Sequence, residues 1–218
     1  MHFICYYYDK DKTKSTYYTD CATRLKNQLE SYGYKTSFDN INFKEKGLND
    51  SYSRLNMVKP QYVLEKMQEL NDSVVWIDAD CVVLQSLEEF ENLQNYDFGY
   101  CVRHHDNRTP HAAVLYFNNT ESSKNFLNSW KLINEEKVKD DSYDCTEHCT
   151  LIDEWDKLNQ KEKDHGIQLL KQKEFRNMAY SGVYEYYKNI SKEENPSVKI
   201  WIGISPDAWE YERLRNKQ

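Results

Sequence analysis

The chain has 218 residues, of which 30% are charged, and a formal net charge of −7. This length can bury a substantial core, and we interpret it as one domain. The negative charge argues against a nucleic-acid backbone or an anionic membrane as a partner.

No apolar run approaches the roughly 18 residues of a membrane-spanning helix, and the N-terminus lacks a basic region followed by a long apolar segment. We therefore expect a soluble, cytoplasmic protein with no membrane span. In a reducing compartment the default expectation for scattered cysteines is free thiols, and their spacing does not match a zinc site. The six cysteines are Cys5, Cys21, Cys81, Cys101, Cys145 and Cys149.

Strand and helix patterns alternate over the first hundred residues. Apolar and β-prone runs predict strands at 3–8, 35–38, 74–84, 96–102, 112–117 and 198–204. The spacing of apolar residues predicts helices from about 17 to Gly33, at 57–70 and at 120–133, with one or two more between 135 and 165. This alternation is typical of an α/β domain with a mostly parallel central sheet, right-handed crossovers and flanking helices.

The most informative stretch is the apolar run from Val74 to Leu84, which two carboxylates interrupt at Asp78 and Asp80. Such a run is typical of a strand buried on both faces of a sheet. On a regular strand residues two apart project to one face, so the two acids would form a doubly negative, oxygen-rich site. A site of this kind favours a divalent cation. Sheets of this class bind ligands at the C-terminal ends of their strands, and we predict the functional site there.

Five segments follow one another along the chain: Tyr6-Tyr7-Tyr8, Arg54 with Lys59-Pro60, Trp76-Ile77-Asp78-Ala79-Asp80, Val114-Leu115-Tyr116-Phe117-Asn118-Asn119, and a helix with Trp130. This order resembles small GT-A glycosyltransferases of bacterial and large-virus polysaccharide synthesis, over roughly residues 1–135. The resemblance implies a single Rossmann-like GT-A domain spanning 1–218, with a nucleotide-binding half at 1–100 and an acceptor-binding half at 101–218. The charged end at 212–218 fits either a terminus or the start of a linker to further domains.

In that family the Asp-X-Asp motif holds Mn²⁺ or Mg²⁺ against the diphosphate of a nucleotide sugar. The resemblance therefore implies that Asp80 ligates the metal and that Asp78 contacts metal or ribose. A divalent ion would stabilise the negative charge that develops on a departing diphosphate. The implied partners are a nucleotide sugar of the UDP-glucose or UDP-rhamnose type and a glycan acceptor. For a viral member the expected location is the host cytoplasm.

Other residues are candidates for donor binding. Tyr6 and Tyr8 share a face by alternation and would hold the base and ribose, with core packing as the alternative for at least one tyrosine. Arg54 and Lys59 would contact phosphate or be solvated surface charges. Arg103, on a loop expected at the same cleft, is a candidate donor or acceptor contact.

Three residues are catalytic candidates. His111 would bond a sugar hydroxyl or assist the leaving group, although lone histidines are often ordinary loop residues. Asp144 and Glu147 lie in an acidic segment where an inverting enzyme would place its base, while a retaining enzyme needs none, and a solvated helical face is the alternative. The resemblance also implies a histidine near the C-terminus that completes the metal site, as in many GT-A enzymes. No histidine follows His165, so this third protein ligand is missing, comes from elsewhere or is replaced by water.

Two other functions remain open. An apolar strand that ends in Asp-X-Asp is also the first motif of haloacid-dehalogenase-type phosphatases, where Asp78 would be the nucleophile and Asp80 the acid–base. That family needs a later acidic cluster, which this chain lacks, and an earlier position for the motif. The non-enzymatic alternative is a carbohydrate-binding domain whose acids hold a structural ion. It predicts glycan binding without nucleotide.

Overall fold

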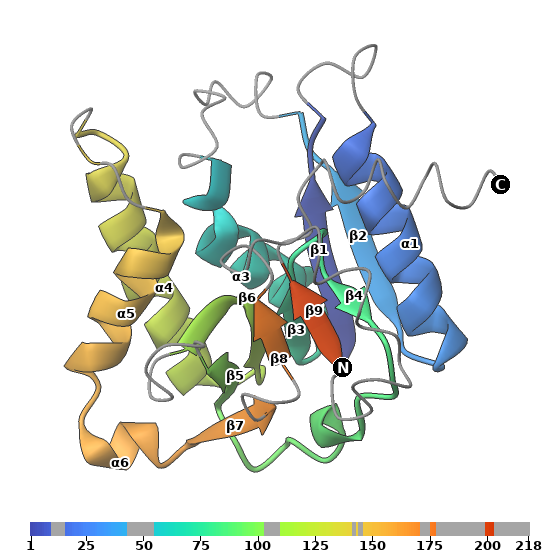
Figure 1. Cartoon of the computed structure of the whole chain (residues 1–218). Helices are drawn as coiled ribbons and strands as arrows, with labels where there is room; N and C mark the ends of the chain where they lie inside the picture. Colours follow the sequence, from blue (N-terminus) through green and yellow to red (C-terminus); the bar gives the residue numbers. More distant parts are fainter. Residues whose placement is uncertain are drawn as a thin grey trace, which may run out of the picture.

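The computed structural model describes most of the chain, and the account below concerns those residues alone. They are residues 1–9, 16–42, 55–102, 110–140, 143, 146–170, 175–177 and 199–202. The element order alternates strands and helices in the first half and adds a small second sheet at the end (Figure 1).

The central sheet has six strands in the order β2-β1-β3-β6-β5-β7. These strands are β1 (His2–Tyr7), β2 (Thr36–Asn40), β3 (Val74–Ile77), β5 (Phe98–Val102), β6 (Pro110–Phe117) and β7 (Gly166–Leu170). β1 pairs in parallel with β2 and β3, and β5 pairs in parallel with β7. β6 runs antiparallel to both β3 and β5, so five strands share one direction. The expected α/β fold with a mostly parallel sheet is confirmed.

Helices cover both faces of this sheet. They are α1 (Tyr17–Ser31), α3 (Lys59–Leu70), α4 (Glu121–Lys137), α5 (Glu147–Lys157) and the short α6 (Gln160–Lys163), together with a 3₁₀ turn, η1 (Glu88–Phe90). Side chains of α1 pack with Phe3 and Val75 in one core cluster. Side chains of α3, α4 and α5 pack with Ile4 and Trp76 in another, because neighbouring strand residues point to opposite faces.

The N-terminus of α1 is capped by an acid from the end of β1. The Asp9 carboxylate accepts hydrogen bonds from the backbone N–H groups of Tyr18, at 2.9 Å, and Thr19, at 3.0 Å. These are first-turn groups that the helix itself leaves unpaired. The helix ends before Gly33, which has a φ of +84° that favours glycine. Asp9 thus fixes the start of α1 directly beside the C-terminal end of β1.

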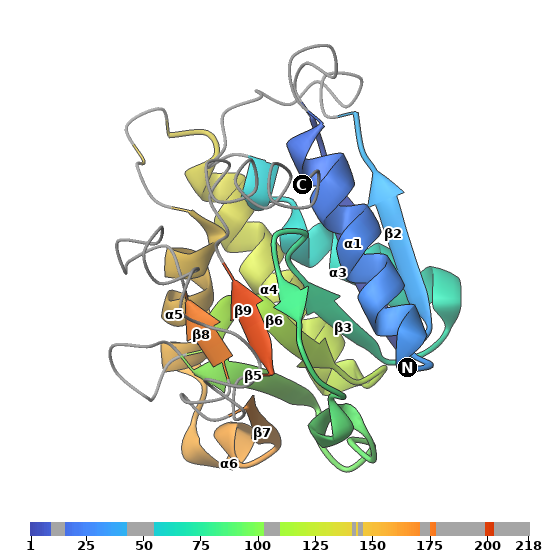
Figure 2. The same ribbon diagram turned by 45° about the vertical axis from the view of Figure 1, so that its right-hand side comes forward.

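A second, three-stranded sheet lies against the α1 face of the central sheet and in front of it in both ribbon views (Figures 1 and 2). It consists of β4 (Val82–Val83), β9 (Ile200–Ile202) and β8 (Phe175–Asn177), in the order β4-β9-β8. β4 and β9 are antiparallel, with Val82 opposite Trp201. The last described strand therefore lies beside the segment that follows Asp80.

The structure corrects the prediction of one strand from 74 to 84. β3 ends at Ile77, a turn follows, and β4 begins at Val82 in the other sheet. β7 and β8 were not predicted, and the other predicted strands and the three individually placed helices are present with shifted ends. α5 and α6 are the two helices expected between 135 and 165.

Cysteine chemistry also departs from the expectation. Cys5, Cys21, Cys81 and Cys101 are buried free thiols. Cys149 is disulfide-bonded, with a partner outside the described residues. The prediction that all six cysteines are free was wrong, because it rested on the expected compartment, which says nothing of which thiols the fold brings together.

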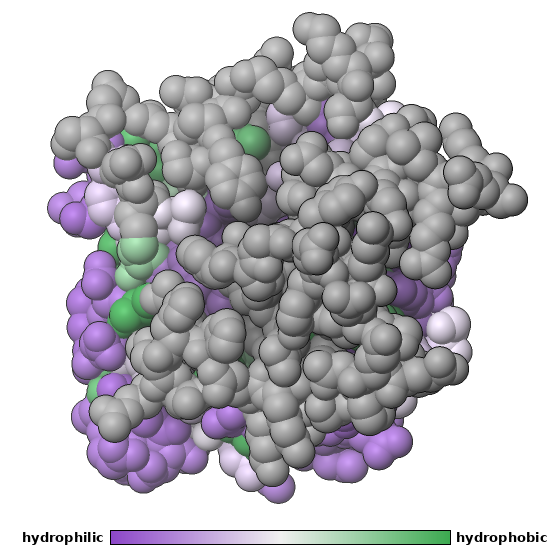
Figure 3. All heavy atoms as spheres, viewed as in Figure 1, coloured by the Kyte–Doolittle hydropathy of each residue, from purple (hydrophilic) through white to green (hydrophobic). Residues whose placement is uncertain are grey.

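Hydrophilic residues gather on the surface around the α6 end of the molecule in Figure 3. α6 has no buried residue, and it is held by a capping box between Asn159 and Glu162. Within the part of the chain that the structure describes, no helix is both long and apolar enough to cross a membrane.

Candidate active site

The two acids of the Asp78-Ala79-Asp80 motif lie in a tight turn at the C-terminal end of β3. The Asp78 N–H donates to the carbonyl oxygen of Ala113 on β6 at 2.9 Å, which continues the sheet by one residue. The Cys81 N–H then donates to the Asp78 carbonyl oxygen at 3.0 Å and closes the turn. The expectation that both acids project from a regular strand was wrong. The turn nevertheless exposes both to one cleft, at the strand end where α/β sheets bind ligands.

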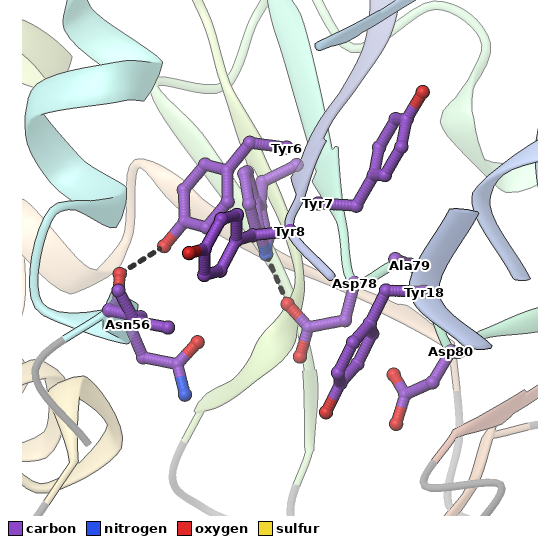
Figure 4. Close-up of a pocket in the computed structure, with 10 residues that line it drawn as sticks. Tyr6, Tyr7, Tyr8, Tyr18, Asn56, Asp78, Ala79 and Asp80 are labelled. Atoms are coloured by element: carbon purple, nitrogen blue, oxygen red, sulfur yellow. Dashed lines mark hydrogen bonds between the residues drawn. The ribbon is translucent and has the colours of Figure 1, made fainter. Parts of the chain in front are cut away.

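Two donors fix one oxygen of Asp78. The Trp76 indole Nε1 donates to Asp78 Oδ1 at 2.7 Å, and the Lys59 Nζ donates to the same atom at 3.0 Å. Among the described residues no donor reaches Asp78 Oδ2, and the side chain is 31% exposed. A dashed line in Figure 4 marks the hydrogen bond that the Asp78 carboxylate accepts from the indole. Asp78 therefore presents a fixed, partly exposed carboxylate oxygen to the cleft.

Lys59 is a buried cation with three acceptors. Its side chain is 1% exposed, and its ammonium donates to Asp78 Oδ1, to the Ala112 carbonyl oxygen at 3.0 Å and to Glu147 Oε1 at 2.7 Å. Burial alone would lower the pKa of Lys59, but the Asp78 and Glu147 carboxylates outweigh it and raise that pKa above its ordinary value. An ammonium has three N–H donors, and all three are used here.

Glu147 begins α5 and is almost fully buried. Lys59 donates to its Oε1, while its Oε2 is buried with no hydrogen-bond partner among the described residues. A buried carboxylate oxygen of this kind carries a desolvation cost that only a nearby positive charge offsets. Lys59 supplies that charge, and it links α3, β6 and α5 behind the Asp78 turn.

Asp80 is the more perturbed of the two motif acids. Burial and the neighbouring Asp78 carboxylate raise the pKa of Asp80 to about 7. Two carboxylates so close together resist carrying two negative charges unless a cation accompanies them. Perturbed acids in a cleft are characteristic of functional sites.

The donor chemistry of this turn fits a hard divalent cation, since it offers carboxylate oxygens. Among the described residues no group of three or more His, Cys, Asp or Glu side chains could hold a metal ion. The two acids would therefore supply part of a coordination shell. The rest would come from ligand oxygens or water, as Mg²⁺ sites commonly arrange.

The cleft beside the turn is rich in aromatic side chains and encloses about 550 Å³ of empty space, part of it open to solvent. It is lined by Tyr6, Tyr7, Tyr8, Tyr18, Leu55, Asn56, Trp76, Asp78, Ala79 and Asp80 (Figure 4).

The side chains of the three consecutive tyrosines alternate in direction, as expected for successive residues of an extended strand. Tyr6 and Tyr8 lie together on one side in Figure 4, and Tyr7 points away from them. Tyr6 is only 7% exposed, packs against Trp76 with a ring distance of 4.8 Å, and donates its hydroxyl to the Leu55 carbonyl oxygen at 2.9 Å. Tyr8 is half-buried. Tyr6 is thus chiefly a packing residue, and Tyr8 has more surface to offer a ligand.

The other predicted site residues fall in two groups. His111 is buried on β6, where its Nδ1 accepts from the Ala113 N–H at 3.1 Å and its ring packs edge-on against His148 at 4.6 Å. His111 and Glu147 do not line the cleft. Arg54, Arg103 and Asp144 lie outside the described residues.

Sequence reasoning singled out four of the ten residues that line the cleft, and Trp76 and Tyr18 are among those that it missed. Trp76 lies two residues before Asp78, and that spacing on one strand was a usable signal. Tyr18, on α1, carries no comparable signal, because only the fold brings α1 beside β3.

Comparisons with known proteins show which solved structures have a similar fold. No protein-family profile and no curated protein matches the sequence. Solved structures do match. One is a glycosyltransferase involved in the glycosylation of the major capsid of PBCV-1, with 12% identity, a TM-score of 0.65, and coverage of 100% of this chain and 98% of that one. Another is the galactosyltransferase LgtC, solved with donor and acceptor sugar analogs, with 11% identity, a TM-score of 0.57, and coverage of 99% and 94%.

A third similar structure is the glycosyltransferase GlyE of Streptococcus pneumoniae TIGR4, with 14% identity, a TM-score of 0.52, and coverage of 94% of this chain and 55% of that one. The fold is therefore that of the GT-A glycosyltransferases. The resemblance drawn from the sequence motifs is confirmed at the level of the fold.

Proposed function

We propose that this protein is a metal-dependent glycosyltransferase that moves a hexose or deoxyhexose from a UDP-sugar to a glycan acceptor. The observation that carries the proposal is the Asp78–Asp80 turn. It brings two acids into an aromatic cleft at the C-terminal edge of a glycosyltransferase fold. Asp80 has a raised pKa, and one oxygen of Asp78 accepts from no donor among the described residues. Fold likeness alone would not select a function, so the proposal depends on this site.

Asp78 and Asp80 would together hold Mn²⁺ or Mg²⁺, with Asp80 the metal ligand and Asp78 a contact to metal or ribose. A bound divalent ion would supply Lewis-acid stabilisation of the leaving diphosphate. Tyr8 would stack on the base, since it combines an apolar ring with partial exposure. Tyr6 would shape the base pocket from behind.

Lys59 and Glu147 would act by holding Asp78. The Lys59 donors are all used within the protein, so a direct bond to phosphate would require it to leave Asp78, Ala112 or Glu147. Arg54 remains a proposed donor contact, and Arg103 a proposed donor or acceptor contact. His111 remains a candidate for bonding a sugar hydroxyl or assisting the leaving group, and Asp144 a candidate base. Glu147 as a base would have to act through its buried Oε2.

The proposal is tested by measuring UDP release from a panel of UDP-sugars, with Mn²⁺ or with chelator, in the wild type and in an Asp78→Ala/Asp80→Ala variant. We expect slow Mn²⁺-dependent release from at least one sugar, because donors hydrolyse without an acceptor, and loss of that release in the variant. A matched control is Asp156→Asn, an exposed acid on α5. A folded double variant with wild-type release would refute the assignment.

Assays with other substrates and ligands separate the alternatives. A phosphatase would release inorganic phosphate from simple phosphate esters and would depend on Asp78 as nucleophile. A carbohydrate-binding domain would bind glycans with no need for nucleotide or metal. Only the transferase predicts that UDP binding and metal binding support each other.

A further inference from the structure

Side chains of α1 hold the backbone that follows the Asp78–Asp80 turn. Arg24 donates a guanidinium N–H to the Cys81 carbonyl oxygen at 3.4 Å. Gln28 Oε1 accepts from the Val83 N–H at 3.1 Å, and the Tyr32 hydroxyl donates to the Leu84 carbonyl oxygen at 3.2 Å. These three side chains are called the α1 clamp below.

The clamp has a regular geometry. Arg24 and Gln28 lie four residues apart on one face of α1, and Tyr32 continues this spacing at the C-cap, one residue beyond the helix. Eight helical residues advance about 12 Å, and the three steps from Cys81 to Leu84 on an extended chain advance about 10 Å. The helix therefore runs beside the strand at nearly matched spacing. Successive clamp residues bond backbone groups at successive points along the segment from Cys81 to Leu84.

The strand that the clamp holds is short. β4 has two residues and, among the described residues, pairs on one edge, with β9. On its other edge the α1 clamp takes the place of a neighbouring strand. Two-residue strands form few ladder bonds of their own, so these side-chain bonds act together with the core packing of Val83 to fix where β4 lies.

The position of β4 in turn fixes Asp80. The turn is anchored at its start, where the Asp78 N–H donates to the Ala113 carbonyl oxygen on β6. It is anchored at its end by Arg24, which bonds Cys81, the residue directly after Asp80. Arg24 is also a cation whose charge acts on the Asp80 carboxylate. Without the second anchor the turn would be free to pivot about β3.

We infer that the α1 clamp, and Arg24 above all, positions Asp80 for metal binding. The inference rests on the proposed function for its metal, while the positioning of the turn stands on geometry alone. Residues that orient a metal ligand without touching the metal commonly change metal affinity by about 10- to 100-fold when replaced.

The test uses the full chain labelled with ¹⁵N and two variants that remove one clamp contact each. Arg24→Met removes the donor and keeps the length of the side chain, and Gln28→Met removes the acceptor. Lys26→Met is the matched control, because it removes one charge from the same helix at a position whose side chain is 49% exposed. Gln28→Glu retains an acceptor and serves as a rescue.

Two readouts are taken on each variant. The amide resonances of Asp80, Cys81 and Val83, with their hydrogen-exchange rates, report on the turn. Titration of UDP in the presence of Mn²⁺ reports on the metal site. We expect shifted Asp80 and Cys81 resonances in Arg24→Met, about tenfold faster exchange of Val83 in Gln28→Met, and about tenfold weaker Mn²⁺-dependent UDP binding in Arg24→Met.

Each outcome decides one claim. Unchanged resonances and exchange in both clamp variants overturn the inference, whatever the nucleotide result. Changed resonances with wild-type UDP affinity also overturn it, since the clamp would then hold the strand without positioning a ligand. If the wild type binds no nucleotide, the proposed function fails, and the NMR arm alone decides whether α1 positions the turn. A merely structural role would lower stability and leave the affinity of the folded fraction unchanged.

Discussion

Glu147 and Lys59 are 88 residues apart in the chain, yet Glu147 Oε1 lies 2.7 Å from the Lys59 ammonium in the protein interior. The same ammonium lies 3.0 Å from Asp78 Oδ1. One buried cation thus stands between a carboxylate that faces the cleft and a carboxylate at the start of α5. The same ammonium therefore stabilises a buried ion pair in the core and holds an acid of the proposed metal site in place.

Replacing Lys59 by Met should lower the free energy of unfolding by about 3–5 kcal/mol, because two carboxylates would lose their buried partner. Urea unfolding measures the change. The control is Lys124→Met, whose exposed pair with Glu121 should contribute less than about 1 kcal/mol. Adding Glu147→Gln to Lys59→Met should restore part of the loss, since it removes one orphaned charge. Equal free energies of unfolding for Lys59→Met and Lys124→Met would contradict this prediction.

Trp76→Phe should weaken Mn²⁺-dependent UDP binding several-fold while keeping the aromatic packing. The change removes the indole N–H that holds Asp78 Oδ1 at 2.7 Å, a bond to a charged group worth about 1.5–3 kcal/mol. Trp130→Phe is the matched control, because its indole N–H donates to Thr150 Oγ1 at 3.0 Å and to the Glu147 carbonyl oxygen at 3.3 Å, and Trp130 does not line the cleft. Both variants should lose stability. A similar loss of nucleotide affinity in both would show that Trp76 has no particular role in the site.

Without metal, the stability of the protein should fall as pH rises from about 4 to about 7. The pKa of Asp80 lies at about 7 in the folded protein against an ordinary value of 3.8, so the folded state binds the extra proton in this window. Deprotonation of Asp80 in this window is unfavourable in the folded state but not in the unfolded chain, so it lowers the free energy of unfolding. Asp80→Asn lacks this titration and should be more stable than the wild type at pH 7.5 by about 1–2 kcal/mol, a value reduced for partial exposure.

Urea unfolding in the presence of a chelator, repeated at pH 4.5, 6 and 7.5, measures that difference. The gap between Asp80→Asn and the wild type should widen with pH and close again when Mn²⁺ is added. Parallel pH curves for the two proteins would mean that Asp80 titrates normally.

The sequence was sufficient for the helices that carry a regular apolar face. Leu25 and Leu29, four residues apart and fully buried, predicted α1, and Gly33 predicted its end. The reversed direction of β6 was also accessible, because only the short segment 103–109 separates β5 from β6, too little for a parallel crossover. β8 was missed because three residues of mixed character carry no strand pattern.

Only part of the site could be predicted from the sequence. Asp78 and Asp80 stand out because charge interrupts an apolar run, and their strand-end position followed from the fold class. The partnership of Lys59 with Glu147 was not visible, since local patterns do not report which distant side chains meet in a core. For the same reason Arg24 drew no attention, although it lies four residues from Gln28 on one helix face, with Tyr32 continuing this spacing at the C-cap.

The most direct test of the central claim is calorimetric titration of UDP into the wild type, Asp80→Asn and Asp156→Asn, each with Mn²⁺ and with chelator. The account predicts binding that requires Mn²⁺, is preserved in Asp156→Asn and falls by at least about tenfold in Asp80→Asn. UDP binding that is indifferent to Mn²⁺ and to Asp80, or no binding by the wild type under either condition, would contradict it.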